Sequence, residues 1–206
     1  MGLHSFTVSR GWLAVASGLV GTLAQLRRVR RFGVEGVSLA TWVLFVYMGC
    51  FWIAYGLVAR SAEVTLGSLL ILPLQLAILV RLKPWLRWAV PARALGYFIA
   101  CCVVPTILWG WAGGVFGTGV AMTINRAPQL IELVRERDAS GVSAVSWFIG
   151  AFGCSLWITY YVGAHLWAAL TATACAGVAN LAIALLATWR HAQACQEPAA
   201  VQAFAT

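Results

Sequence analysis

The chain alternates between long apolar stretches and short polar segments that hold most of its charged residues. Each apolar stretch is about 20 residues long, which is enough for a helix to cross the roughly 30 Å hydrocarbon core of a bilayer. We therefore expect an all-α polytopic membrane protein with about seven transmembrane helices. The expected spans are Gly11–Arg28, Val37–Val58, Val64–Leu82, Ala92–Trp111, Gly114–Val134, Val142–Gly163 and Leu166–Trp189.

One order of residues occurs twice along the chain. The two copies keep one register, with an offset of about 105 residues, and a later match at Gln75-Leu76-Ala77-Ile78 and Asn180-Leu181-Ala182-Ile183 preserves it. Matching blocks in a single register indicate an internal duplication. The first copy holds Gln25, Gly36-Val37-Ser38, Trp42 and Trp52-Ile53-Ala54-Tyr55, and the second holds Gln129, Gly141-Val142-Ser143, Trp147 and Trp157-Ile158-Thr159-Tyr160.

In the second copy, Ala127-Pro128-Gln129-Leu130 precedes a short charged turn and the Gly-Val-Ser block. This motif resembles the PQ-loop family, and within it the full-length, two-repeat SWEET-type (MtN3/saliva-like) sugar transporters. The first copy departs from the motif, since Ala24 stands where proline is expected. The resemblance implies two parallel three-helix units, residues 1–84 and 113–190, joined by a linking helix at 85–112. The Ala- and Gln-rich segment 191–206 is expected to be a disordered cytoplasmic tail.

Composition and charge agree with a membrane location. The chain is 62% hydrophobic and 10% charged, whereas soluble domains carry about 25% charged residues. Its net charge of +8 lies in short segments between spans, which indicates membrane orientation rather than nucleic-acid binding. Basic residues mark the cytoplasmic side, so we expect the N-terminus outside and the C-terminus inside. The excess of arginine over lysine and the short loops favour a bacterial inner membrane. The basic residues expected inside are Arg27, Arg28, Arg30, Arg31, Arg81, Lys83, Arg87, Arg93, Arg135, Arg137 and Arg190.

The sequence offers no arrangement typical of catalysis. The three histidines are scattered in loops and tails, no CxxC spacing occurs, and no pair of carboxylates falls within a span. Phosphate-binding glycine loops and metal-ligand spacings are also missing. We therefore expect neither enzymatic activity nor a cofactor nor a metal.

Proline in the fifth expected span predicts a bend. Pro128 removes one backbone hydrogen bond and clashes with the preceding turn, and Gln129 is expected to partner the freed carbonyls. The resemblance implies that this proline acts as a hinge, and a static kink is the alternative. In the first copy Gln25 is kept but Ala24 should hinge less, so we expect unequal motion of the two halves. Pro73 and Pro105 interrupt further helices.

Two tryptophans occupy matching positions three residues before a tyrosine. The resemblance implies that Trp157 aligns with an aromatic side chain that stacks on the sugar ring, and Trp52 is its mate in the first copy. Cys154 lies one turn before Trp157 on the same helix face. The alternative is that both indoles only pack in the core or in the interfacial belt.

The third helix of each copy is expected to supply polar groups. The resemblance implies an asparagine about thirteen residues after each tyrosine, but Ser68 and Thr173 stand there. Gln75 and Asn180 follow seven residues later, which is about two turns and the same helix face. We expect these four residues to form polar stripes toward the interior. The alternative is that the two amides only bond neighbouring helices.

Three further residues complete the predicted site. Arg126 is the only basic residue well inside a span, so it either snorkels to the inner surface or attracts an anionic or zwitterionic solute. Tyr55 and Tyr160 sit at the outer ends of matching helices and are expected to belong to a gate. Arg60, Glu63 and His165 lie near them, and a solvated loop is the alternative.

Together, these features predict a membrane transporter that moves a small polar solute, with a sugar expected, down its gradient by alternating access. Its partners would be the solute and the lipid bilayer, with a homo-oligomer also allowed. The alternatives are a transporter of another metabolite, such as an amino acid or nucleoside, and a non-transporting receptor or scaffold of the same fold.

Overall fold

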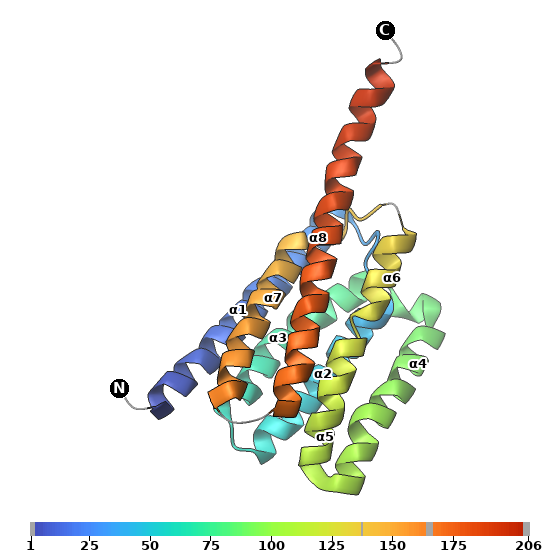
Figure 1. Ribbon diagram of the computed structural model, residues 1–206. Helices are drawn as coiled ribbons and strands as arrows, with labels where there is room; N and C mark the ends of the chain where they lie inside the picture. The colour runs from blue at the N-terminus through green and yellow to red at the C-terminus, as the bar shows by residue number, and fades with distance from the viewer. Residues whose placement is uncertain (1–2, 137, 164–166, 204–206) are drawn as a thin grey trace.

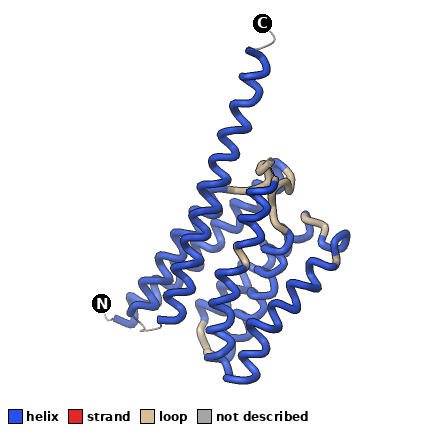
Figure 2. Tube along the Cα trace, turned by 45° about the vertical axis from the view of Figure 1, so that its right-hand side comes forward, coloured by secondary structure: helices blue, strands red, loops and turns tan. Residues whose placement is uncertain are grey.

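The computed structural model describes residues 3–136, 138–163 and 167–203, and every regular element in this part of the chain is a helix (Figures 1 and 2). The expectation of an all-α protein is confirmed at this level. In order, the elements are α1 Leu3–Phe32, α2 Leu39–Val58, α3 Ala62–Arg81, the 3-10 turn η1 Pro84–Arg87, α4 Ala89–Phe98, the π-helical turn η2 Ile99–Val103, α5 Val104–Ile124, α6 Ala127–Arg135, α7 Ala144–Gly163 and α8 Trp167–Ala203.

Four helical stretches in the described residues are long and apolar enough to cross a membrane. The exterior of the bundle is apolar as well: Ile107 is 75% exposed and Val178 is 71% exposed. A lipid-facing surface has this character, because the surrounding solvent is itself apolar. These are the features of an integral membrane protein. The four stretches are Leu39–Val58, Ala62–Arg81, Ala89–Arg135 and Thr173–Cys195, and a shorter apolar helix covers Ala144–Thr159.

The stretch from Ala89 to Arg135 folds back on itself at Gly110, where the backbone has φ 68° and ψ −167°. Both views show α4 and α5 running side by side (Figures 1 and 2). Small residues of α5, among them Gly117 and Ala121, lie where α5 packs against η2. A Cβ atom on Gly117 would lie 1.8 Å from the carbonyl oxygen of Cys101. These residues therefore let the two backbones approach closely, the role that small residues have in membrane helix pairs.

A break separates α5 from α6 inside the fifth expected span. Helix α5 ends at Ile124, and Pro128 lies in the first turn of α6. Proline cannot donate to the carbonyl four residues earlier, and its ring collides with that carbonyl. The predicted kink is confirmed, although the chain breaks ahead of the proline, at Asn125 and Arg126. In the first copy, α1 runs through Ala24 without interruption.

The helices pack in a pattern that repeats between the two copies. Helix α3 contacts both α1 and α2, and α8 contacts both α5 and α7. Across the copies, α1 packs on α7 and α2 contacts α6. Helix α3 thus packs against two helices of the first copy, and α8 against two helices of the second. The segments that hold the two sequence copies meet through the α1–α7 and α2–α6 contacts.

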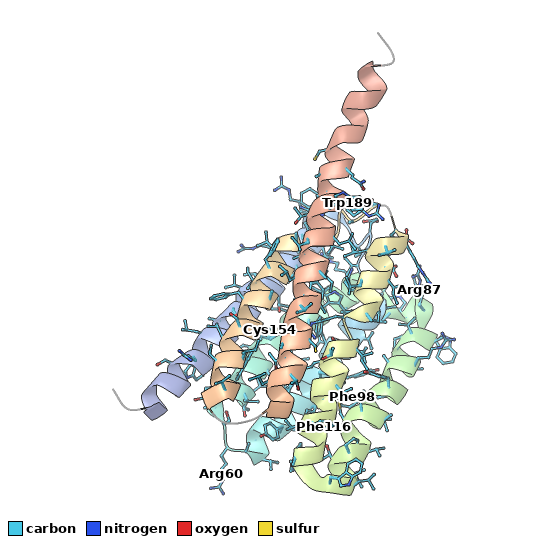
Figure 3. All side chains as sticks on the ribbon, viewed as in Figure 1. Arg60, Arg87, Phe98, Phe116, Cys154 and Trp189 are labelled. Atoms are coloured by element: carbon cyan, nitrogen blue, oxygen red, sulfur yellow. The ribbon has the colours of Figure 1, made fainter. Side chains whose placement is uncertain are left out.

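The end of the bundle that carries residues 33–38 and 138–143 is called the loop end below. Arg87 and Trp189 lie toward it, and Arg60 lies at the opposite end (Figure 3). A buried apolar cluster closes the loop end, and it contains the repeat-related pairs Val37/Val142, Trp42/Trp147 and Ile78/Ile183. Its other buried members are Leu26, Val29, Leu133, Ala139, Ala184 and Ala187.

The expectation of a disordered tail at 191–206 is wrong for residues 191–203. Helix α8 continues through Ala203 and projects beyond the other helices (Figure 1). Alanine and glutamine are strong helix formers, so a segment rich in both can extend an existing helix. The start of the extension is also anchored, because the His191 ring lies 2.9 Å from the carbonyl oxygen of Ala139 and 3.1 Å from Arg28 Nη2.

Candidate functional site

Gln25, on α1 of the first copy, binds the loop of the second copy. Its Nε2 donates to the carbonyl oxygen of Gly141 at 2.8 Å, and its Oε1 accepts from the backbone N–H of Ser143 at 2.8 Å. The side chain is only 1% exposed. Both ends of the amide are therefore satisfied by backbone groups at positions more than 110 residues away in sequence.

Gln129, on α6 of the second copy, makes the same pair of bonds in the opposite direction. Its Nε2 donates to the carbonyl oxygen of Gly36 at 2.6 Å, and its Oε1 accepts from the N–H of Ser38 at 2.9 Å. It is also 1% exposed. Each glutamine thus holds the Gly-Val-Ser loop of the other copy, and we call the four bonds the glutamine clamp.

The predicted role of Gln129 as a partner for carbonyls freed by the proline is wrong. The amide points across to the other copy instead, where a loop offers one donor and one acceptor. The carbonyl of Asn125, at the break, accepts from Thr41 Oγ1 at 2.9 Å. A residue of α2 therefore satisfies the backbone that the break exposes, as buried polar groups require.

The two loops of the clamp touch each other through their glycines. A Cβ atom on Gly36 would lie 2.7 Å from the carbonyl oxygen of Asp138, and one on Gly141 would lie 2.6 Å from that of Gly33. Gly36 also has φ 72°, which side-chain-bearing residues rarely adopt. Glycine at both positions lets the loops interlock, and this contact completes the closure of the loop end.

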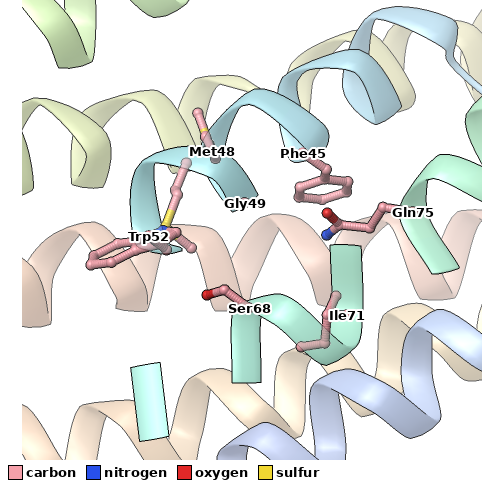
Figure 4. A pocket seen from close by; sticks show the side chains of 8 residues that line it. Phe45, Met48, Gly49, Trp52, Ser68, Ile71 and Gln75 are labelled. Carbon is pink, nitrogen blue, oxygen red and sulfur yellow. The ribbon is translucent and has the colours of Figure 1, made fainter. Parts of the chain in front are cut away.

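Two adjoining cavities lie between the helices. The first, the Trp52 cavity, has a volume of about 190 Å³ and places α2 side chains opposite α3 side chains (Figure 4). The second, the Arg126 cavity, has a volume of about 180 Å³ and lies between the two copies. The Trp52 cavity is lined by Phe45, Met48, Gly49, Trp52, Ser68, Ile71, Gln75 and Met122. The Arg126 cavity is lined by Ser17, Gly18, Gly21, Thr22, Trp42, Phe45, Ile71, Gln75, Arg126, Ser146, Trp147, Gly150 and Asn180.

Trp42 and Trp147 belong both to the Arg126 cavity and to the cluster that closes the loop end. The cavity therefore begins directly beside the closed end. Sequence reasoning used this pair only as a marker of the duplication and missed its place in the site. The signal was present, because each tryptophan follows the serine of its Gly-Val-Ser block by four residues, one helical turn into the next helix.

Arg126 lines the cavity with a buried guanidinium. The residue is 5% exposed, so the alternative that it snorkels to the surface is wrong. Its Nε donates to Asn180 Oδ1 at 2.5 Å, and its Nη1 donates to the carbonyl of Met122 and to Asn125 Oδ1, the latter at 3.0 Å. Among the described residues no carboxylate pairs with it. The charge is thus held in place by neutral oxygens.

Of the predicted polar stripes, three of the four residues line a cavity. Ser68 and Gln75 face the Trp52 cavity, and Gln75 and Asn180 face the Arg126 cavity. The Oε1 atom of Gln75 is buried and accepts no hydrogen bond from the described residues. Thr173, the fourth, lines neither cavity in the described part of the chain. The polar face predicted for α3 is confirmed, and that of α8 is confined to Asn180.

The two tryptophans predicted to contact the solute occupy different surroundings in the structure. Trp52 lines its cavity, whereas Trp157 lines neither cavity among the described residues. Cys154 is buried behind Asn180, whose Nδ2 donates to the Cys154 sulfur at 3.5 Å. The first copy therefore supplies the aromatic wall that the resemblance implied for the second, and contact of Trp157 with solute stays a prediction.

Tyr55 packs in an aromatic cluster rather than in a polar gate. Its ring stacks on Phe51 with centroids 6.5 Å apart and lies 5.9 Å from that of Trp111. Glu63 accepts from the Ser61 hydroxyl at 3.0 Å, and Arg60 forms no ion pair with it in the residues that the structure describes. The side chain of Tyr160, and all of His165, lie outside the described residues.

The site holds no arrangement for metal binding in the part of the chain described, since no three His, Cys, Asp or Glu side chains are grouped there. No family model, curated protein or solved structure matches the chain. The chemistry of the site is therefore that of its own residues: aromatic walls, two amides, hydroxyls and one buried cation. Such a lining can bind and orient a small polar solute.

Proposed function

We propose that the protein is a transporter of the PQ-loop, SWEET-like type, which carries a small polar solute by alternating access. The glutamine clamp is the observation that supports this most directly. A reciprocal set of hydrogen bonds seals one end of a cavity between two related units, and the same bonds can break to open it. A polar solute cannot shed its water in lipid, and the cavity groups replace that water.

The helix packing supports a 3+1+3 arrangement of seven spans. In this proposal α1, α2 and α3 form the first unit, and α7 and α8 join α5 and α6 in the second. The broken pair α5 and α6 acts as one span, and α4 with η2 is the linking helix. The central places of α3 and α8, and the matching contacts of α1 with α7 and α2 with α6, are what two related units would produce.

The proposed orientation follows from charge. Most basic residues fall at the loop end, and cytoplasmic loops of membrane proteins carry an excess of Lys and Arg. The glutamine clamp then closes the cytoplasmic side of a bacterial inner membrane, with the N-terminus outside and the C-terminus inside. In this orientation, the structure has its cytoplasmic side closed.

A sugar is the solute that the resemblance implies, and the Trp52 cavity has suitable groups. An indole offers an apolar face to a pyranose ring, while Ser68 and Gln75 offer hydrogen bonds to its hydroxyls. A charged metabolite is the second candidate, and Arg126 favours it. A receptor of the same fold would bind the same solutes without moving them.

Uptake into proteoliposomes tests the proposal. Radiolabelled sugars, amino acids and small organic acids are offered to liposomes that hold the purified protein, with empty liposomes as the control. We expect saturable uptake that stops at equilibrium, together with counterflow. Binding without flux for every solute would favour the receptor and overturn the transporter.

A disulfide across the loop end tests the alternating access. Glu35 and Asp138 are exposed and lie in the two interlocked loops. In a background with Cys50, Cys175 and Cys195 replaced by serine, Glu35→Cys with Asp138→Cys should abolish uptake under oxidation and recover it under reductant. Each single cysteine serves as the control. Uptake by the oxidised double variant at the reduced rate would contradict the mechanism.

A further inference from the structure

We propose that the Arg126 cavity is a carboxylate site, and that the solute is a small monocarboxylic acid carrying a hydroxyl or ammonium hydrogen-bond donor. That this acid is transported rests on the proposed function, but the binding site itself does not depend on it. Three features of the described residues carry the assignment: a buried cation without a counter-charge, a buried acceptor without a donor, and a cavity lined by the side chains of both.

Arg126 is buried at an energetic cost that its own contacts offset only in part. A charge inside a membrane protein pairs with an opposite charge or lines a water-filled path. Here its partners are the neutral oxygens of Asn180, Met122 and Asn125, together with the Phe45 ring, whose centroid lies 5.8 Å from Cζ. Among the described residues, no aspartate or glutamate lines either cavity. A ligand carboxylate would supply the missing negative charge, whereas a cation would be repelled.

The guanidinium keeps one nitrogen for such a ligand. Within the part of the chain that the structure describes, the hydrogen bonds of Arg126 use Nε and Nη1, and none uses Nη2. Those bonds fix the plane of the fork, because Asn180 on α8 and the carbonyl of Met122 on α5 hold it from two elements. A pre-oriented guanidinium is well suited to a carboxylate, because Nη2 can donate a charge-assisted hydrogen bond to one of its oxygens.

Gln75 supplies the second recognition group. Its Oε1 is buried without a donor, and leaving such an acceptor unpaired is unfavourable. Gln75 lines the same cavity as Arg126, and its Oε1 lies beside Gly49, so one ligand can meet both side chains once the Gln75 amide turns toward the cavity. The ligand then needs an acceptor-rich anionic end for Arg126 and a donor for Gln75. A carboxylate with a hydroxyl or ammonium group has both.

Comparison of the two copies indicates that the ligand carries a single carboxylate. Thr22 stands in the first copy where Arg126 stands in the second, counting from the paired glutamines. Its hydroxyl donates to the carbonyl of Gly18 at 2.8 Å and carries no charge. The charge of the cavity is therefore on one side only. Its volume of about 180 Å³ corresponds to roughly six water molecules at liquid density, which suits a compact acid.

Binding to the purified wild-type protein tests the assignment without any substitution. Trp42 and Trp147 line the cavity, so quenching of tryptophan fluorescence can report occupancy. The ligands are matched pairs of an acid and its primary amide: lactate with lactamide, and alanine with alaninamide. Glucose is the neutral comparison. We expect each acid to bind at least about tenfold more tightly than its amide. Equal binding within the lactate pair would overturn the proposal.

Variants then locate the contact. Arg126→Gln should lower the affinity for lactate to that for lactamide, and Arg126→Lys should give an intermediate value because it keeps the charge but loses the fork. Arg135→Gln, at an exposed position in the last turn of α6, is the matched control and should change nothing. Gln75→Leu should weaken lactate and alanine but leave propionate unchanged, since propionate has no donor. Lactate affinity unaltered in Arg126→Gln would count against the site.

The outcomes separate this inference from the proposed function. Carboxylate binding without uptake would support the carboxylate site and contradict the transporter function. Saturable uptake of a sugar without carboxylate binding would support the transporter function and contradict the carboxylate site.

Discussion

Gln25 and Gln129 occupy matching positions in the two copies, and each binds the loop that follows the other. The relationship is reciprocal, so neither copy can move its loop away without breaking bonds made by both. All four bonds involve backbone groups of the loops. The clamp therefore couples the opening of one half to that of the other.

The first prediction concerns this coupling. Gln25→Leu and Gln129→Leu each leave a buried N–H and a buried carbonyl unpaired, at a cost of about 1–3 kcal/mol per group. Each should destabilise the closed loop end and make a cysteine at Val142, which is 1% exposed in the closed end, label faster. Because both amides hold one interface, the double variant should lose less than the sum of the single losses, and labelling rates in a double-mutant cycle measure this. Gln193→Leu, further along α8, is the control.

Purely additive effects in that cycle would show that the two glutamines act separately, and would contradict the coupling. Slower labelling of Val142→Cys in either single variant would contradict the clamp itself.

The second prediction concerns the unequal halves. The chain breaks at Asn125 and Arg126 ahead of Pro128, whereas α1 is continuous through Ala24. Backbone amides near the break should exchange with deuterium faster than those of residues 20–24, and mass spectrometry of peptides from the folded protein measures this. Ala24→Pro should remove the difference, because an interior proline destabilises a helix by about 3 kcal/mol. Equal exchange in the wild type would show that the break adds no mobility.

The kink and the all-helical, membrane-spanning character of the chain could be predicted because their causes are local. Twenty apolar residues make a membrane helix wherever they stand, and Pro128 blocks a hydrogen bond in any surroundings. The partner of Gln129 could not be predicted, since it lies in another copy and depends on how the copies meet. The same holds for Trp52 and Trp157, which are equivalent in sequence but differ in which cavity wall they reach.

The extension of α8 was missed for another reason. Composition alone does not separate an alanine-rich helix from a disordered tail, because both lack a hydrophobic core of their own. Helices gain much of their stability from packing or from continuity with a longer helix. Here the segment after Arg190 continues an existing helix, and His191 contacts Ala139 at its start.

The third prediction concerns the glycine contact between α5 and η2. A methyl group on Gly117 would meet the carbonyl oxygen of Cys101 at 1.8 Å, so Gly117→Ala forces the helices apart. Overpacking of this kind costs about 1–3 kcal/mol. Gly96→Ala is the matched control, because no atom lies within 4 Å of its Cβ position. It should be neutral or stabilise by about 0.5–1 kcal/mol.

Thermal unfolding in detergent compares these two variants directly. The midpoint should fall for Gly117→Ala and stay level or rise for Gly96→Ala. A midpoint unchanged by Gly117→Ala would show that the α5 contact can relax without loss, and the close approach would lose its structural importance.

The fourth prediction separates the two tryptophans that the duplication makes equivalent. The resemblance implies that Trp157 stacks on the solute, but Trp52 is the one that lines a cavity, beside Ser68 and Gln75. Loss of an aromatic wall removes apolar contact worth about 1 kcal/mol or more, so Trp52→Ala should lower solute affinity by roughly fivefold to tenfold. Trp52→Phe should retain most of it. Trp157→Ala should leave affinity unchanged while the inner side stays closed. Solute titrations of the purified variants measure this, and a loss confined to Trp157→Ala would place the solute against the second copy instead.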